Sequence, residues 1–288
     1  MKKWDEVSLF VIVAVLALGI FVWYQVLFTG PATRPEIYFL DVGQGDAEIV
    51  VLPGNIKIMT DAGPDQKVVS SIEKALSKGD KYIDIGIISH PQLDHFNGYN
   101  YLLDNYTFGA FIWNGRQGEK TVPQWAALLE KIKSKNVPLV TLAAGDRIRY
   151  QNNQIDFLSP DGNFIQSAEL NDTGFVELVK TSEFRTLLVA DIGFSVENYL
   201  VRRGADIKAD ILKAAHHGSK HSSGADFLRA VGAKVAVIGV GDKNRYGHPT
   251  KEALNRLEAA GAKIFRTDQN GTVKIFAEGR KLKIIVKK

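Results

Sequence analysis

The 288 residues of this chain are 45% hydrophobic and 24% charged, a composition that excludes a largely disordered protein. The chain is long enough for one large domain or two small ones. It contains no cysteine, which excludes disulfides, thiolate metal sites and a cysteine nucleophile, so any metal must bind to histidine, carboxylate or amide oxygen. The net charge of +4 is compatible with an anionic partner but too small to require one.

The N-terminal stretch SLFVIVAVLALGIFVWYQVLF, residues 8–28, carries no charged side chain. Its length predicts one membrane-spanning helix, and Lys2 and Lys3 before it predict a cytoplasmic N-terminus with the remaining chain outside. A cleaved signal peptide is the rival interpretation, but the apolar run is long for one and no small-residue cleavage site follows. A buried core helix is the third interpretation of this stretch. We predict a membrane anchor and tether over residues 1–35 and one folded domain over 36–288.

The folded domain begins with three predicted strands within residues 36–63, separated by a glycine-rich turn and by the turn Pro53–Asn55. Periodic apolar residues and glycine or proline stops then predict helices over 66–79, 97–106, 123–137, 195–204, 225–233 and 250–262. Apolar runs predict strands over 82–89, 109–115, 146–158, 175–181, 185–192, 210–219, 235–241, 263–267 and 272–286. Both halves alternate strands with helices, which predicts an α+β fold, an αββα sandwich of two facing sheets with helices outside.

Side chains capable of binding metal recur at the ends of four predicted strands. They are Asp61; His90, Asp94 and His95; Asp191; and His216 with His217. Taken singly, Asp61 could form a turn, Asp191 could cap the next helix, and the histidine pair could be one buried and one exposed residue. Five of the six histidines nevertheless fall in two short clusters, which favours a site for zinc, manganese or iron.

The motifs FLDVGQGDA, TDAG, SHPQLDH, the Asn171–Asp172 pair, VADI, KAAHHGSKHSS and GVGDKNRYGHP occur in this order along the chain. The set resembles the metallo-β-lactamase fold and, more narrowly, the metallo-hydrolase domain of the ComEC family of DNA-uptake proteins. The resemblance covers residues 36–285. It does not include the multi-helix channel of full ComEC proteins.

The resemblance implies an αββα sandwich with one or two divalent ions, zinc or manganese, at the edge between its halves. The residues implied to hold the first ion are Asp94, His95, Asp191 and either His216 or His217. Asp191 would bridge to a second ion whose ligands include His90, and Asp61 would orient a ligand histidine by a hydrogen bond. Asp94 would also be catalytic, because it could orient the water molecule that such a centre activates.

Two departures from the family pattern bear on the second ion. Gln92 stands where the family usually has histidine or aspartate, and an amide oxygen is a poorer zinc ligand than imidazole. There is also no histidine between His95 and His216, so that only Asn171 or Asp172 is available there. We predict one firmly held ion and a second that is loose, or is manganese or magnesium rather than zinc.

The late segment GVGDKNRYGHP places Asn244 and His248 as candidates to contact an anionic substrate, with His248 as a catalytic acid toward the leaving group. Alternatively, Asn244 only shapes the loop and His248 leads into a helix capped by Thr250. Ser219, in the polar loop after the two histidines, could hydrogen-bond to phosphate oxygens or belong to a merely flexible loop.

These features predict a membrane-anchored, extracytoplasmic, metal-dependent phosphodiesterase or nuclease acting on DNA during uptake. The alternatives are a non-catalytic or weakly active subunit that binds DNA or docks on a separate membrane channel protein, and a surface phosphodiesterase with another substrate. Four cations near the motifs could contact phosphates, namely Lys213, Lys220, Lys243 and Arg245. No aromatic stacking platform is recognisable in the sequence.

Overall fold

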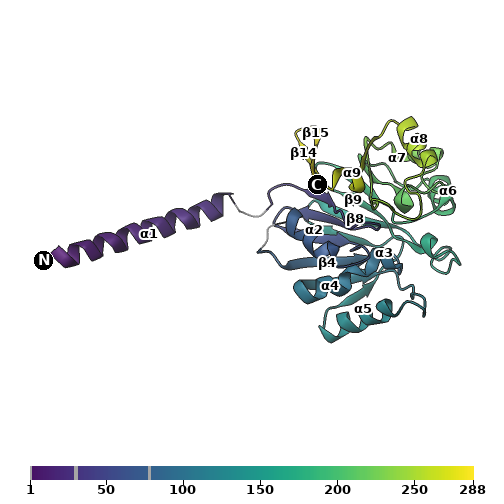
Figure 1. The fold of residues 1–288 in the computed structure, drawn as a ribbon. Helices are drawn as coiled ribbons and strands as arrows, with labels where there is room; N and C mark the ends of the chain where they lie inside the picture. The colour runs from purple at the N-terminus through teal and green to yellow at the C-terminus, as the bar shows by residue number, and fades with distance from the viewer. Residues whose placement is uncertain (1, 29–31, 77–78) are drawn as a thin grey trace.

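The computed structural model describes residues 2–28, 32–76 and 79–288, and within them two β-sheets face one another (Figure 1). The first sheet has the strand order β15 (Lys281–Lys287), β14 (Thr272–Glu278), β1 (Glu36–Phe39), β2 (Glu48–Leu52), β3 (Ile56–Thr60), β4 (Tyr82–Ile88), β5 (Thr107–Trp113) and β6 (Leu139–Thr141). The second has the order β13 (Lys263–Arg266), β12 (Val235–Ile238), β11 (Ile211–Lys213), β10 (Arg185–Leu188), β9 (Val176–Lys180), β8 (Asn153–Ser159) and β7 (Arg147–Tyr150).

Helices cover the outer face of each sheet (Figure 1). The first sheet carries α2 (Lys67–Ala75), α3 (Leu93–Phe96), α4 (Gly98–Asn105) and α5 (Pro123–Ser134), and the second carries α6 (Phe194–Arg202), α7 (Ala225–Val231) and α8 (Lys251–Ala259). The short segments η1 (Leu170–Thr173), η2 (Ala215–Gly218) and α9 (Thr267–Asn270) lie in loops. This arrangement confirms the αββα sandwich predicted from the sequence.

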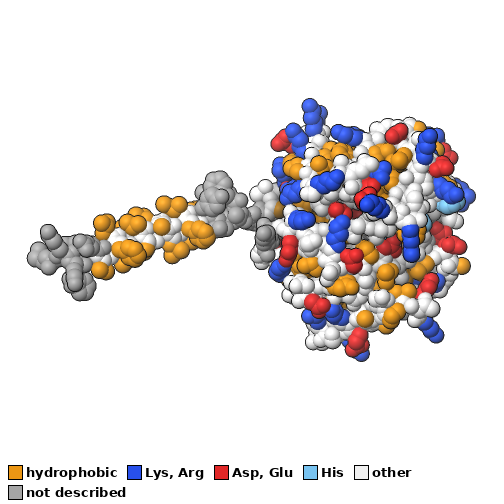
Figure 2. Space-filling view, viewed as in Figure 1, with side chains coloured by type: hydrophobic (Ala, Val, Ile, Leu, Met, Phe, Trp, Pro, Cys, Tyr) orange, Lys and Arg blue, Asp and Glu red, His pale blue; other side chains and the backbone are white. Residues whose placement is uncertain are grey.

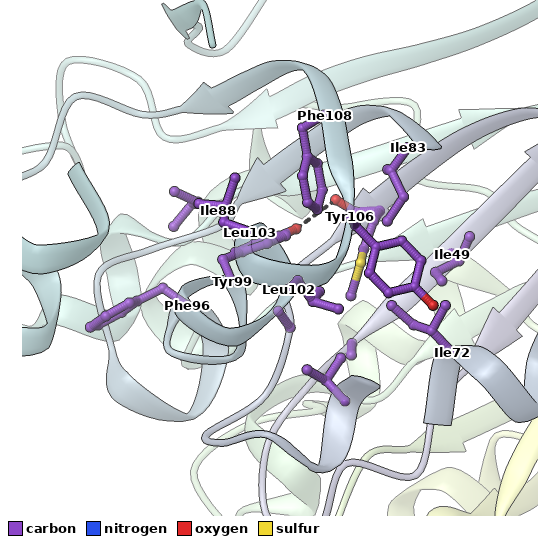
Figure 3. Close-up of a cluster of buried hydrophobic side chains, with 14 of the residues drawn as sticks. Ile49, Ile72, Ile83, Ile88, Phe96, Tyr99, Leu102, Leu103, Tyr106 and Phe108 are labelled. Atoms are coloured by element: carbon purple, nitrogen blue, oxygen red, sulfur yellow. Dashed lines mark hydrogen bonds between the residues drawn. The ribbon is translucent and has the colours of Figure 1, made fainter. Parts of the chain in front are cut away.

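Alternation along the strands separates three apolar layers. In β1, Ile37 and Phe39 face the second sheet, whereas Tyr38 between them packs under the helices. Figure 3 shows the layer beneath α4, which includes Tyr99. The hydroxyl of Tyr99 lies within hydrogen-bond distance of the carbonyl oxygens of Met59 (2.8 Å) and Ile87 (3.0 Å). These bonds tie α4 to the ends of β3 and β4, the two strands that lead into the metal-binding motifs.

The short segments α3, η1 and α9 were not predicted, and strands β11 and β6 also differ from the sequence prediction. The strand expected over 210–219 ends at Lys213, because the following residues turn sharply into η2, in which His216 and His217 have φ values of 49° and 52°. Strand β6 was not predicted, since its three residues are too few to show alternation.

Helix α1 (Lys2–Phe28) extends away from the body of the molecule, and its described side chains, from residue 7 to residue 23, are almost all exposed and largely hydrophobic (Figures 1 and 2). Within the described part of the chain, no helix is long and apolar enough to cross a membrane. The single-pass span predicted for residues 8–28 is therefore not supported. The side chains of Lys2 and Lys3, and residues 29–31 of the predicted tether, lie outside the described residues.

Candidate metal centre

The four metal-binding motifs meet at one edge of the sandwich because of the strand order. β3 and β4 are parallel neighbours in the first sheet, and β10 and β11 are parallel neighbours in the second. The carboxyl ends of parallel strands lie at the same edge of a sheet, so the loops that follow each pair emerge together. With the two sheets face to face, Asp61 and the SHPQLDH loop lie opposite Asp191 and the histidine pair.

Four side chains converge at this edge. The Oδ2 atom of Asp191 lies 3.3 Å from His95 Nε2 and 3.4 Å from His217 Nε2. Asp94 Oδ2 lies 3.3 Å from the same His217 Nε2 atom. Both Nε2 atoms are buried and have no hydrogen-bond partner. A buried polar atom without a partner is costly, and here two such nitrogens lie within 3.4 Å of the same carboxylate oxygen, as ligands of one cation do.

Hydrogen bonds on the far side of each ring fix this orientation. His95 Nδ1 lies 2.7 Å from Asp61 Oδ2, and Asp61 in turn accepts bonds from the backbone N–H (2.9 Å) and hydroxyl (2.6 Å) of Ser89. His217 Nδ1 donates to the carbonyl oxygen of Gly239 (2.8 Å). The proton held on Nδ1 in such bonds leaves each Nε2 able to present a lone pair to a bound cation. Without a cation, burial opposes the charge on both imidazoles, but the surrounding carboxylates, first Asp191, raise the pKa of His95 and His217 well above its ordinary value.

Asp46, which the sequence analysis did not single out, lies behind the two rings. It groups with His95, Asp191 and His217 within 4.8 Å, but it approaches the Nδ1 edges, 3.3 Å from His217 and 4.0 Å from His95. A cation at the Nε2 side would therefore meet Asp94 rather than Asp46. The sequence signal was present in GQGDA, where the glycines allow this carboxylate to reach inward: a Cβ on Gly45 would collide with the Asp94 carbonyl oxygen.

Asp46 is paired with Lys213, whose ammonium group is buried and donates to Asp46 and to the Ala214 carbonyl oxygen. Burial disfavours both charges, but Lys213 holds the pKa of Asp46 below its usual value and Asp46 raises the pKa of Lys213. The expectation that Lys213 contacts phosphates is therefore wrong, because its side chain is 1% exposed. Lys220, Lys243 and Arg245 are exposed.

The backbone at the centre adopts left-handed conformations at non-glycine residues. The φ values are 56° at Asp61, 42° at Ala190, 49° at His216 and 52° at His217. Each costs on the order of 1 kcal/mol or more and persists only where the surroundings impose it. Such residues gather at functional sites, and each of these four carries, flanks or hydrogen-bonds to one of the converging side chains.

His90 and Gln92 lie beside the centre, and their side chains are hydrogen-bonded to each other. His90 is fully buried, with Nε2 3.0 Å from Gln92 Oε1 and Nδ1 2.9 Å from the Ser89 hydroxyl. Burial, with the charge of His95, lowers the pKa of His90 to about 4, so the ring is neutral. Its ring centroid is 4.2 Å from that of His95.

The two adjacent histidines of the KAAHHGS motif have different positions. His217 is buried at the centre, whereas His216 is 32% exposed and its Nε2 lies 3.9 Å from Asp191 Oδ2. The Asn171 amide nitrogen lies 3.4 Å from both ring nitrogens of His216. Asp172 instead accepts a hydrogen bond from the Gly193 backbone (3.3 Å). His216 and Asn171 thus lie at the rim, and His217 is the member of the pair that reaches the converging carboxylates.

A cavity of about 210 Å³ opens onto this constellation. Its lining residues are Gln44, Gln92, Leu93, Asp94, Asn171, Asp191, His216, His217, Tyr246 and His248. A larger open hollow of about 780 Å³ lies between α2 and α4, lined by residues such as Lys67, Glu73 and Tyr101. The smaller cavity is lined by three of the converging side chains, those of Asp94, Asp191 and His217, so it is the cleft of the site.

The remaining sequence candidates, Asn244, Ser219 and His248, lie in loops near the cleft. Asn244 donates to the carbonyl oxygens of Gly241 (3.0 Å) and His248 (2.6 Å) and accepts from two backbone N–H groups of its own loop, which is the loop-shaping alternative. Ser219 is buried, accepts a hydrogen bond from the His221 backbone (3.3 Å) and is not among the residues that line the cleft. Burial and the charges of His216 and His217 lower the pKa of His248 to about 4, which disfavours a general-acid role at neutral pH.

Glu177, on β9, is buried near the centre and makes the protein's stability depend on pH. Its carboxyl group accepts a hydrogen bond from the Thr60 hydroxyl (3.0 Å), and burial raises the pKa of Glu177 to about 8. Folding therefore favours the protonated form of Glu177. Its contribution to the free energy of unfolding is complete below pH 4.5, the ordinary pKa of a glutamic acid, and is lost as the pH rises through 8.

We expect the free energy of unfolding to fall by an amount on the order of 3 kcal/mol between pH 5 and 8, and Glu177→Gln to remove most of this slope. Urea unfolding at a series of pH values measures it. Other groups whose pKa is raised in the folded protein contribute to the slope left in the variant, among them Glu197, whose pKa burial raises to about 7, and the buried Glu48. An unchanged slope in Glu177→Gln would show that Glu177 is ionised in the folded protein.

Comparison with known proteins supports the resemblance inferred from the motifs. No family model matches the chain. It is 29% identical over 259 residues to ComE operon protein 3 of Bacillus subtilis, covering 84% of this chain and 33% of that protein. It is 28% identical over 273 residues to competence protein ComA of Neisseria gonorrhoeae, covering 93% and 36%. The chain therefore spans about a third of the length of the curated relatives that it matches.

Solved structures support the fold. The metallo-β-lactamase fold protein YhfI from Bacillus subtilis aligns with a TM-score of 0.54 at 13% identity, over 81% of this chain and 96% of that one. Zinc-bound PqqB from Methylobacterium extorquens aligns with a TM-score of 0.50 at 11% identity, over 80% and 97%. The chain has the metallo-β-lactamase fold and is similar in sequence to competence proteins of the ComEC type, as its motifs predicted.

Proposed function

We propose that this metallo-β-lactamase fold chain is a metal-dependent hydrolase that cleaves a phosphodiester bond of DNA. One observation carries the hydrolase part: the unpartnered Nε2 atoms of His95 and His217 converge with two carboxylates at the floor of a cleft. The DNA part is supported by the similarity to competence proteins and by the exposed cations Lys220, Lys243 and Arg245.

The residues present fit one divalent ion. Two imidazoles and two carboxylates suit zinc or manganese, and each imidazole is held from behind, as ligand histidines usually are. Asp94, His95, Asp191 and His217 would hold the ion. When bound there, a divalent metal activates a water molecule and polarises the phosphoryl group.

The chain's own residues would prepare the reaction. Burial opposes the charge on Asp94, but the nearby His217 imidazole, 3.3 Å away, and the charge of His95 lower the pKa of Asp94 to about 2. Asp94 is therefore a carboxylate at neutral pH and can accept a hydrogen bond from the attacking water, which orients it. His248, neutral at that pH, can hydrogen-bond to a phosphate oxygen from the cleft wall.

The test is metal content and hydrolysis measured on the same purified full chain. Mass spectrometry would give the metal content, and bis(p-nitrophenyl) phosphate and single-stranded DNA would be assayed with manganese, zinc or magnesium. Metal-dependent cleavage that disappears in Asp94→Ala supports the proposal. A folded chain that binds no metal and cleaves neither substrate would overturn it.

Gln92 bears on the second ion. Because His90 is tied to an uncharged amide, we expect the chain to hold one equivalent of metal tightly and any second equivalent loosely. Gln92→His should supply an imidazole beside His90 and Asp191 and raise the tightly held content to two equivalents. The matched control is Gln44→His, which alters another glutamine of the same cleft and should leave one equivalent. Two tightly held equivalents in the unaltered chain would contradict this expectation.

The pairing of His90 with Gln92 also favours a second candidate, a non-catalytic subunit that binds DNA or docks on a separate membrane channel protein. Metal-independent DNA binding without hydrolysis would select it. We also propose that the chain is attached to a membrane, which the exposed hydrophobic side chains of α1 support. Fractionation of cells expressing the chain, with and without residues 1–35, tests the attachment.

A further inference from the structure

Tyr246 exposes an aromatic ring at the mouth of the cleft. It is 54% exposed, although it lines the same cavity as Asp94 and Asp191. Leu93, 39% exposed, lines the cavity as well. The floor of the cleft is polar and charged, so these two side chains give its entrance an apolar surface that a purely ionic substrate does not need.

The ring is held in place rather than free to swing. It stacks on His248, with centroids 5.9 Å apart and an interplanar angle of 27°. The Arg245 guanidinium donates to the Tyr246 hydroxyl (3.0 Å) and lies 5.1 Å from the ring centroid. The Asn244 side chain bonds four backbone groups of the loop, including the N–H of Tyr246. A ring on so fixed a loop loses little entropy when a ligand stacks on it.

We propose that Tyr246 stacks against an unpaired base next to the scissile phosphate, so that the site selects single-stranded DNA. Every base has a π-face, and stacking on an aromatic side chain contributes about 1–3 kcal/mol per base. In a duplex those faces are covered by neighbouring bases. The exposed cations Lys243 and Arg245 flank the ring in the same loop, where they can meet adjoining phosphates. The inference rests on the proposed phosphodiesterase function and adds its substrate class.

The experiment compares two strands of equal length, one with normal bases and one with abasic tetrahydrofuran residues. For the full chain with manganese, we expect KM for the base-bearing strand to be about tenfold lower or more. Tyr246→Ala should raise that KM until the two strands differ by less than about twofold, and Tyr246→Trp should keep the preference. Fluorescence anisotropy with metal-free protein measures the same preference as binding, without hydrolysis.

The control variant is Tyr101→Ala, which removes an exposed tyrosine of α4 outside the cleft and should preserve the preference. If Tyr246→Ala weakens the binding of both strands equally, or keeps the preference for the base-bearing strand, the ring only supports its loop and the inference is wrong. Hydrolysis of bis(p-nitrophenyl) phosphate without cleavage or binding of either strand would overturn the inference while leaving the hydrolase standing. If the chain binds the base-bearing strand more tightly but hydrolyses no substrate, the stacking is upheld and the catalytic proposal is rejected.

Discussion

Replacing Asp191 with asparagine is expected to reduce the metal content to near zero and to lower kcat on a phosphodiester on the order of a thousandfold. Asp191 Oδ2 is the atom that both ring nitrogens approach, at 3.3 Å and 3.4 Å. The amide lacks the charge that offsets a cation in this buried position, and a metal contributes several kcal/mol to the transition state, with each 1.36 kcal/mol worth a factor of ten. Metal analysis and steady-state kinetics on one preparation measure both effects.

The matched control for Asp191 is Asp206→Asn, a carboxylate of the same half that is 54% exposed and pairs with Arg185 and Lys180. It should leave the metal content and kcat unchanged. Asp61→Asn should have an effect between those of Asp191→Asn and Asp206→Asn, with about a 10- to 100-fold loss of metal affinity, because Asp61 acts through the His95 ring. Full metal occupancy in Asp191→Asn would exclude Asp191 from the ligand set.

Lys213→Met is expected to destabilise the domain by about 3–5 kcal/mol, the largest stability effect that we foresee. The substitution keeps the volume but leaves Asp46 as a buried carboxylate whose other charged neighbours are His217 and His95. For a domain of this size, about 1 kcal/mol lowers Tm by roughly 2–4 °C. Chemical and thermal unfolding measure the loss.

A double-mutant cycle with Asp46→Asn shows whether the loss comes from the pair. The double variant should be more stable than Lys213→Met alone, because the buried charge that Lys213 offset is gone. If Lys213→Met instead keeps its stability and loses affinity for DNA, the earlier expectation of a phosphate contact would be restored. The control Lys220→Met removes an exposed lysine seven residues later and should change stability by less than about 0.5 kcal/mol.

Local pattern was sufficient for much of the fold. The helix period of residues 123–137 and the apolar strand over 82–89 were recognisable, and both elements occur as α5 and β4. The motifs at the strand ends also indicated which residues gather, because parallel neighbouring strands bring their carboxyl ends to one edge. Local pattern did not predict short elements such as β6. It also did not predict the end of strand β11, which is set by the left-handed turn at His216 and His217.

The sequence by itself determined the secondary-structure periods, the order of the motifs and the donor types at the centre, since each of these depends on neighbouring residues. Only the tertiary structure decided the roles that depend on burial and on contacts between distant residues. Asp46 and Lys213 are 167 positions apart, and the burial of both turned an expected phosphate contact into an internal ion pair. Tyr246 reads as an ordinary loop residue until the fold places it at the cleft. The physical reason is that desolvation and convergence arise only when the two sheets pack together.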